Sequence, residues 1–221
     1  MKVLVISVHP DDETLGCGGT ILKHKKNNDE MYWLIITGVS TELGYSKDFI
    51  DKRKKQVLDV SKAYGFKDVI NLNFPAAKLY NVDFSLLLDK ISETIQKIKP
   101  HTVYTVNRSD IHTDHQIAAK AVMSSLKSFR AAFVKRLLMY ECLSETEIAF
   151  PLPENVFIPN SYSDITEFID DKIKIMEIYS SEVQQPPYPR SLENIKSLAR
   201  FRGASVSAYY AEAFMLLRDV F

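Results

Sequence analysis

In residues 3–13 the chain runs Val3-Leu-Val-Ile-Ser-Val-His-Pro-Asp-Asp-Glu13. The first six residues are nearly all apolar and β-branched, which is typical of a strand covered on both faces of a parallel sheet. Ionisable side chains follow at once at His9, Asp11, Asp12 and Glu13, and a proline stiffens the turn that presents them. Because functional groups in open α/β sheets gather at the carboxyl ends of strands, this stretch predicts a parallel sheet and one half of a site.

Apolar runs and amphipathic segments alternate through the first 140 residues. We expect strands at 3–8, 31–37, 68–72, 102–106 and 134–140, and helices at 13–27, 48–64, 83–98 and 116–127. The helix at 83–98 has apolar side chains at helical spacing and stops before Pro100. Strands that alternate with helices predict βαβ units. The fold class is therefore α/β, a Rossmann-like three-layer αβα sandwich with a mostly parallel sheet.

The remainder of the chain is less regular. Three prolines interrupt residues 151–159, where we expect a loop or an edge strand. Further elements are expected as a helix at 164–179, a rigid loop at 185–189, a helix at 191–202 closed by Gly203, and a final segment at 209–217. Since neither a repeat nor an interdomain linker interrupts the pattern, residues 1–221 are expected to form a single domain.

Composition narrows the class of partner. The 221 residues carry 28 basic and 28 acidic side chains without a basic stripe, which argues against nucleic acid or an anionic membrane as the main partner. No apolar segment approaches the ~20 residues that span a bilayer, and the start lacks a secretory pattern. Two cysteines, Cys17 and Cys142, indicate a reducing compartment. We expect a cytoplasmic protein, and a homo-oligomer is compatible with this reading.

A second polar cluster, Asp110-Ile-His-Thr-Asp-His115, follows the expected strand at 102–106. Catalytic zinc sites use three His, Asp or Glu ligands and leave one position to water. His9 and Asp12 supply two such ligands, and His115 supplies the third. The alternative makes His9 a buried core histidine and Asp12 a helix N-cap. Because both clusters follow strands of one sheet, we favour a metal site, with Zn2+ or Fe2+ or another divalent metal as the ion.

The remaining polar side chains suggest roles around such a metal. Asp11 is a carboxylate that the metal does not need as a ligand, so it is a candidate base for water. His112 lies three residues before His115, beside the metal, where a protonated ring would stabilise an oxyanion. Asp114 is expected to orient one of these imidazoles. For Asp110 and Asp114 the alternative is a favourable charge at a helix N-terminus.

The glycines at 16, 18 and 19 begin eight residues after the first strand and lack dinucleotide-loop spacing. We expect them to permit close packing of a helix on the sheet. No role follows from the sequence for Glu13 or Glu212, and the loop at 144–160 is expected to form part of a substrate rim.

The motifs His9-Pro-Asp-Asp-Glu13 and His112-x-Asp-His115 resemble those of the PIG-L/LmbE-like family of zinc-dependent N-acetylglucosaminyl deacetylases. Weaker similarities to that family are Arg53-x-x-Gln56 with Gly65, Tyr179-x-Ser181-Glu182, Pro187-Tyr-Pro189, Ala199-Arg-x-Arg-Gly203 and Tyr210-Ala-Glu-Ala-Phe214. The resemblance thus extends from residue 3 to residue 214. Thr113, Gln56 and Val39 depart from the family pattern, which usually has a proline, a glutamate and an acidic residue at these positions.

The resemblance implies a hydrolase that removes the N-acetyl group from an N-acetylglucosamine-type sugar or sugar conjugate by attack of zinc-activated water. It also implies metal ligands at His9, Asp12 and His115, a base at Asp11, an electrophilic partner at His112 and a substrate contact at Arg53. The partner would be a small N-acetylated sugar or glycoconjugate. Two alternatives remain: an amidase of the same fold acting on another N-acyl substrate such as a thiol conjugate, and a non-catalytic α/β ligand-binding module.

Overall fold

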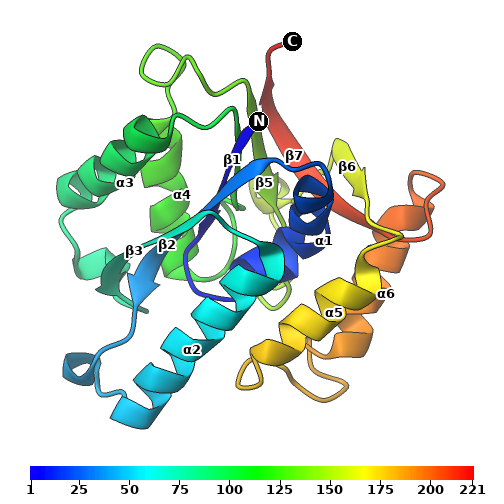
Figure 1. Cartoon of the computed structure of the whole chain (residues 1–221), viewed down its shortest axis with the longest axis horizontal. Helices are drawn as coiled ribbons and strands as arrows, with labels where there is room; N and C mark the ends of the chain where they lie inside the picture. Colours follow the sequence, from blue (N-terminus) through cyan, green and yellow to red (C-terminus); the bar gives the residue numbers. More distant parts are fainter.

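The structure, a computed structural model, describes all residues from 1 to 221 and shows a seven-stranded sheet with helices on both faces (Figure 1). The strands are β1 (Lys2–Ser7), β2 (Glu30–Gly38), β3 (Asp68–Pro75), β4 (Thr102–Val106), β5 (Arg136–Tyr140), β6 (Ser161–Asp164) and β7 (Ala211–Asp219). The helices are α1 (Asp12–Lys26), α2 (Lys47–Tyr64), α3 (Phe84–Ile98), α4 (Thr113–Ser125), α5 (Ile169–Ile178) and α6 (Leu192–Ala204), with 3-10 turns η1 (Thr41–Leu43), η2 (Leu79–Asn81) and η3 (Pro153–Asn155). None of the helices is long and apolar enough to cross a membrane.

The strand order is β3-β2-β1-β4-β5-β7-β6. The first five strands in the sequence pair in parallel, and Val3 of β1 lies between Met31 of β2 and Thr102 of β4. β7 runs antiparallel to β5, and β6 runs antiparallel to β7. The direction of strand addition reverses between β1 and β4, so a topological switch point lies between the carboxyl ends of these two strands. The predicted mostly parallel α/β sheet is confirmed.

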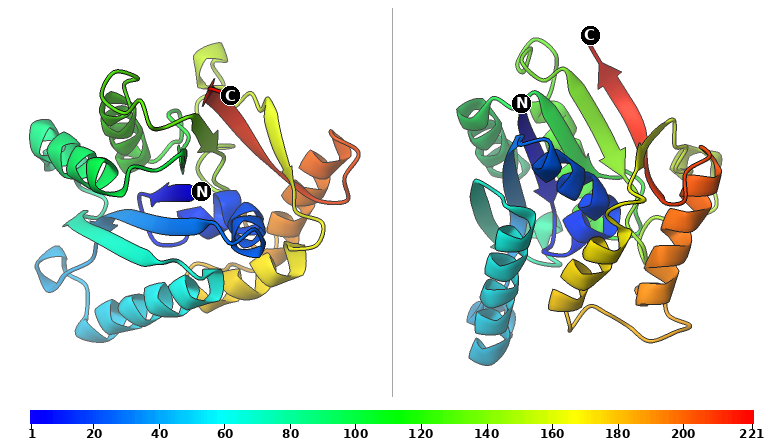
Figure 2. Two further views of the ribbon diagram at one scale, coloured as in Figure 1. Left: turned by 45° about the horizontal axis from the view of Figure 1, so that its top comes forward. Right: turned by 45° about the vertical axis from the view of Figure 1, so that its right-hand side comes forward.

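Three layers are visible when the sheet is viewed on edge (Figure 2, left). Helices α3 and α4 cover one face, whereas α1, α2 and α5 cover the other and α6 packs on α5 and β7. The placement of helix α3 follows from its sequence. Four of its apolar side chains recur at helical spacing and are all buried on one face, namely Leu87, Ile91, Ile95 and Ile98. The αβα sandwich predicted from the sequence is therefore confirmed.

Helix α1 approaches the sheet closely because its glycines have no side chains. A Cβ on Gly16 would lie 2.1 Å from the Tyr140 ring on β5, and a Cβ on Gly19 would lie 2.7 Å from Ile165. Between them, Cys17 has non-helical backbone angles (φ −144°, ψ 22°), so α1 is kinked. The expected close packing on the sheet is confirmed for Gly16, whereas a Cβ on Gly18 would meet Tyr64 of α2 and Gly19 faces Ile165 in the segment after β6.

Glu212 of β7 stabilises the second part of this kinked helix. Its carboxylate accepts hydrogen bonds from the backbone N–H groups of Gly19 (2.8 Å) and Thr20 (2.7 Å), and it pairs with Lys172 of α5 at 2.7 Å. Lys172 also donates to the Leu15 carbonyl at 2.9 Å. Since both charged side chains are buried, this pair ties α1, α5 and β7 together, which gives Glu212 a structural role.

Two boundaries in the C-terminal part differ from prediction. The helix expected at 164–179 begins at Ile169, because residues 161–164 form the edge strand β6. This Ser-Tyr-Ser-Asp strand has no apolar run that would reveal it. Gly203 lies inside α6 rather than closing it, and a Cβ there would lie 2.7 Å from the Ala208 carbonyl oxygen. The glycine therefore allows close packing against the chain that returns towards β7.

Candidate metal centre and active site

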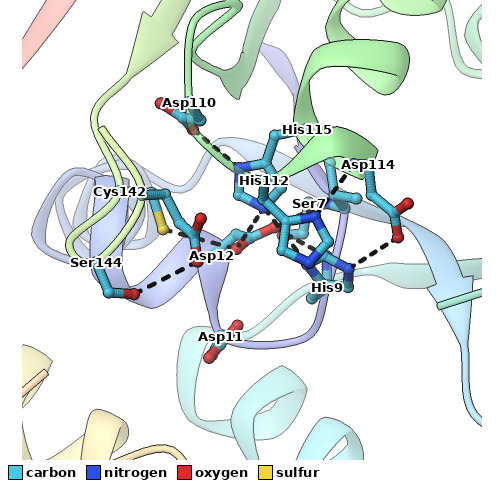
Figure 3. Close-up of polar contacts among 12 residues, drawn as sticks. Ser7, His9, Asp11, Asp12, Asp110, His112, Asp114, His115, Cys142 and Ser144 are labelled. Carbon is cyan, nitrogen blue, oxygen red and sulfur yellow. Dashed lines mark hydrogen bonds and ion pairs between the residues drawn. The ribbon is translucent and has the colours of Figure 1, made fainter. Parts of the chain in front are cut away.

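The two polar clusters meet at the switch point between β1 and β4 (Figure 3). One cluster follows β1, which ends at Ser7, and the other follows β4, which ends at Val106. Figure 3 shows the rings of His9, His112 and His115 gathered at the centre. Parallel pairing of adjacent strands places both loops at the same edge of the sheet, so residues about a hundred positions apart become neighbours.

Three predicted ligands converge on one point. The Nε2 atom of His115 lies 3.4 Å from Nδ1 of His9 and 3.4 Å from Oδ1 of Asp12. One ligand atom from each residue lies within 4.8 Å of the others. The second oxygen of Asp12 accepts from the backbone N–H groups of Val8 and His9, both at 2.8 Å, so Asp12 is held in place without capping α1. Two imidazole nitrogens and a carboxylate oxygen form a donor set that suits a divalent metal.

Each histidine of this set has a carboxylate next to the ring nitrogen that does not face the other ligands. Oδ2 of Asp110 lies 2.9 Å from Nδ1 of His115, and Oδ2 of Asp114 lies 3.3 Å from Nε2 of His9. Asp114 is itself held by the backbone N–H groups of Ala77 (2.7 Å) and Leu79 (3.0 Å). Carboxylates in this position fix the tautomer and orientation of a metal-binding imidazole. The contacts favour an orienting role for Asp110 and Asp114 over a simple helix-terminal charge.

The charges in this set stabilise one another. Burial by itself would raise the pKa of Asp12, but His115 and His9 outweigh it and hold that pKa well below its usual range. Burial would lower the pKa of His115, but Asp12 and Asp110 raise it well above its usual value. Asp12 is therefore ionised at neutral pH, the state in which a carboxylate can coordinate a metal.

Asp11 has a strained backbone, with φ +130° and ψ −27° at the start of α1. Such angles persist in a non-glycine residue only where surrounding contacts enforce them. Glu13 provides one, because its carboxylate accepts the Asp11 N–H at 3.1 Å. Glu13 also accepts hydrogen bonds from Ser7, Thr14 and Tyr179 at 3.2, 2.7 and 2.9 Å. The fully buried Glu13 therefore shapes the turn that presents Asp11, and burial raises the pKa of Glu13 to about 7.

The side chain of Asp11 lies to one side of the ring cluster (Figure 3). Burial, and then the negative charges of Asp12 and Glu182, raise the pKa of Asp11 well above its usual value. Arg190 opposes this effect through an ion pair, with its Nη1 atom 3.2 Å from Oδ2 of Asp11. Asp11 is thus a buried carboxylate beside the candidate metal set and is not one of the three converging ligands.

His112 caps the N-terminus of α4, where its Nδ1 atom accepts the Asp114 N–H at 3.1 Å. Its ring centroid lies 4.6 Å from that of His9 and 5.4 Å from that of His115, beside the ligand set as expected. Burial and the two neighbouring imidazoles lower the pKa of His112 to about 4. The ring is therefore neutral at pH 7 rather than protonated, and with Nδ1 used as an acceptor its proton resides on Nε2.

A cavity of about 400 Å³ opens over these residues. Arg53 of α2 lines it and donates to the Pro10 carbonyl at 3.1 Å while pairing with Glu182. Of the loop at 144–160, only Ser144 and Glu145 line this cavity. The structure therefore brings Arg53 to the site, as predicted, and places only the start of that loop at its rim.

Two lining residues, Glu182 and Arg190, were not singled out as site residues in the sequence. Glu182 belongs to a motif that carries the family resemblance, whereas no local pattern marks Arg190. Gln56, one of the departures from that family, lies outside the cavity lining and donates to the Ile178 carbonyl at 3.0 Å. Gln56 therefore links α2 to α5. Val39, another position that departs from the family pattern, does line the cavity.

Comparison with known families agrees with this geometry. The model of the PIG-L family, described as GlcNAc-PI de-N-acetylase, matches residues 4–126, more than half of the chain. This chain belongs to the PIG-L family. The match contains both halves of the candidate site, and the resemblance read from the His9–Glu13 and His112–His115 motifs is confirmed.

Individual relatives are distant but cover most of the chain. A probable N-acetyl-α-D-glucosaminyl L-malate deacetylase 2 of Bacillus cereus is 25% identical over 190 residues, which cover 82% of this chain and 84% of that protein. The crystal structure of the conserved protein TT1542 from Thermus thermophilus shares 28% identity and a TM-score of 0.78, covering 99% of this chain and 96% of that one. The 4-carboxy-2-hydroxymuconate hydratase GalB of Pseudomonas putida KT2440 has a TM-score of 0.75 at 16% identity, covering 100% of this chain and 97% of that one. The last likeness shows the fold alone.

Proposed function

We propose that this PIG-L family protein is a metal-dependent hydrolase that removes the N-acetyl group from an N-acetylglucosamine-type sugar or sugar conjugate. The observation that carries the proposal is the convergence of His9, Asp12 and His115 beside Asp11 and His112 in the lining of one cavity. Family membership and the name of the Bacillus cereus deacetylase support the choice of an acetamide on glucosamine as the substrate.

His9, Asp12 and His115 would hold the metal. A bound Zn2+ would polarise the acetamide carbonyl and lower the pKa of a water molecule in the site. Two nitrogens and one oxygen also suit Fe2+. The backbone hydrogen bonds to Asp12 and the carboxylates behind His9 and His115 keep the three donor atoms aimed at one point.

The other residues have distinct tasks in this proposal. Asp11 takes a proton from the attacking water, and that proton passes to the nitrogen as the C–N bond breaks, so that acetate and a free amino sugar are formed. His112, whose Nδ1 atom is already used, donates from Nε2 to the carbonyl oxygen as negative charge develops there. Arg53 contributes to the cavity wall, where we assign it a substrate contact.

We further propose that residues 1–221 act as one catalytic domain. The main cluster of buried apolar side chains extends from Val3 to Phe214 and includes members from both the parallel and the antiparallel parts of the sheet, whereas a second cluster has only three residues. One continuous core is what a single cooperative domain requires.

The fold alone does not identify the reaction, because a hydratase has the same fold. An amidase acting on another N-acyl compound, such as a thiol conjugate, would use the same residues. The test is therefore acetate release by the purified metal-loaded protein from several N-acetylated sugars and from N-acyl thiol conjugates, together with metal analysis. Sugar deacetylation with about one bound metal ion supports the proposal. Metal without acetate release from any sugar would favour the amidase, and a protein that binds no divalent metal refutes both.

Substitution of the candidate base gives a sharper test. Asp11→Asn should retain the metal, since Asp11 is not a ligand, and should lower kcat at least ~100-fold through loss of proton transfer. Asp59→Asn, at an exposed ion pair with Lys55 on α2, serves as the matched control. Wild-type turnover by Asp11→Asn would remove Asp11 from the mechanism.

A further inference from the structure

Arg190 lies at the centre of a chain of alternating charges that encloses one side of the cavity. Its Nη1 atom is 3.2 Å from Oδ2 of Asp11 and 3.2 Å from Oε2 of Glu182. The other oxygen of Glu182 pairs with Arg53, which donates to the Pro10 carbonyl. The chain thus connects three separate segments: the β1–α1 loop that carries Asp11, helix α2, and the loop between α5 and α6.

The loop that carries Arg190 is itself held in place. The Gln184 N–H donates to the Arg190 carbonyl, and the Arg190 N–H donates to the Gln184 side chain, both at 3.2 Å. Asn194, in the first turn of α6, donates to the Pro189 carbonyl at 2.7 Å. These bonds on either side of Arg190 make its guanidinium a defined anchor rather than a mobile surface charge.

Asp11 depends on this anchor for the position of its carboxylate. Glu13 and the helical hydrogen bonds hold the Asp11 backbone, but the ion pair with Arg190 is the contact that holds the side chain. Arg190 contacts Oδ2, which leaves Oδ1 available for a proton from water. Arg190 also supplies positive charge that offsets the negative charges of Asp12 and Glu182 around Asp11.

One donor group of Arg190 has no protein acceptor. Its Nε atom is buried and has no hydrogen-bond partner. A buried donor without a partner is unfavourable, and native structures contain few of them. Both side-chain hydrogen bonds of Arg190 come from Nη1 and go to the carboxylates of Asp11 and Glu182, whereas Nε has no protein partner.

We propose that Arg190 is a positioning residue: held by Glu182, it orients the carboxylate of Asp11 for proton transfer. The inference rests on the proposed function, in which Asp11 is the base. A substrate-binding arginine in the same place would act on KM, whereas a positioning residue acts on kcat through Asp11.

The test compares Arg190→Met and Arg190→Lys in the metal-loaded enzyme. Arg190→Met keeps most of the aliphatic stem and should lower kcat ~10–100-fold, the usual effect of removing an orienting partner. KM should stay within about threefold and metal content should not change. Arg190→Lys, which retains a donor and a charge, should recover part of kcat. Arg202→Met is the matched control, because Arg202 forms a similarly buried pair with Glu141 outside this cavity.

A double-substitution cycle separates positioning from a general structural role. In the Asp11→Asn background, Arg190→Met should lower the residual kcat by less than about threefold, because the group through which it acts is gone. A full additional loss in that background would overturn the inference, as would an effect confined to KM.

Crystal structures of the wild type and Arg190→Met test whether Arg190 positions the Asp11 carboxylate without any activity measurement. Failure of this inference can therefore be told apart from failure of the proposed function. We expect the Asp11 carboxylate to move in the variant while His9, Asp12 and His115 stay in place. An unmoved carboxylate overturns the inference even if the wild type deacetylates sugars. Absence of acetate release from the wild type overturns the proposed function but not the positioning of Asp11.

Discussion

The sharpest single perturbation of the candidate metal centre is Asp110→Asn. Asp110 is fully buried and accepts from three donors: His115 Nδ1 at 2.9 Å, Thr146 Oγ1 at 2.6 Å and Asn107 Nδ2 at 3.1 Å. A carboxylate accepts from all three, whereas an asparagine has one acceptor oxygen and one amide group that donates. If the oxygen faces His115, the new amide meets the donors of Thr146 and Asn107. The isosteric change therefore leaves at least one of the three donors facing the new amide group instead of an acceptor.

The magnitude follows from the contact with His115. Loss of an orienting carboxylate behind a metal-binding imidazole costs ~10–100-fold in metal affinity. This range corresponds to about 1.4–2.8 kcal/mol of metal-binding free energy. The ligand atoms themselves are unchanged, so we expect a weakened site rather than an abolished one. Catalysis at saturating metal should fall less than in Asp11→Asn.

The assay is the Zn2+ dissociation constant measured by competition with a chromophoric chelator. Asp29→Asn is the matched control, because Asp29 lies 2.8 Å from Nδ1 of His24 in a similar pair outside the cavity. That variant should bind Zn2+ like the wild type, and Asp12→Asn should show the loss of a ligand. An Asp110→Asn protein with a dissociation constant within twofold of wild type would refute the reasoning, since the carboxylate would then not orient His115.

The remaining predictions concern the scaffold that presents the site. Glu212→Gln leaves Lys172 buried without its counter-charge, so the free energy of unfolding measured with urea should fall by about 3–5 kcal/mol. The double variant with Lys172→Met should recover part of this loss. A loss under 1 kcal/mol in the single variant would contradict the structural role of the Glu212–Lys172 pair. Gly16→Ala places a Cβ 2.1 Å from the buried Tyr140 ring, and the overpacking should cost about 1–3 kcal/mol in the same assay. A change of less than 0.5 kcal/mol, on the scale of ordinary surface substitutions, would show that Tyr140 can move.

Much of the fold could be read from local pattern. The apolar β-branched run before His9 and the amphipathic helix ending before Pro100 carry their own signatures, and both elements form where predicted. Strand β6 could not be read in this way. Its polar Ser161–Asp164 sequence is a strand only because β7 offers a free edge for backbone pairing, and that edge exists only after the chain has returned from α6.

The metal ligands could likewise be predicted from local pattern, whereas the residues that hold other site residues in place could not. His9, Asp12 and His115 were predicted because each follows an apolar run that local pattern identifies as a strand. For Asp110, a role in the site and a simple helix-terminal charge fitted the sequence equally well, and its contact with His115 at 2.9 Å favours the first. Arg190 gave no signal, because its partner Asp11 lies 179 positions away and they meet only through the packing of the α5–α6 loop over the cavity.

By itself, the sequence determined the alternation of strands and helices, the family and the polar motifs that follow β1 and β4, because these depend on local periodicity and on short motifs. Only the tertiary structure decided how the site is held together. The strained Asp11, the burial of Glu13 and the ion pair with Arg190 depend on contacts between segments far apart in the chain. Local propensity cannot encode such contacts, since each is defined by two surfaces that meet only when the sheet and its covering helices have assembled.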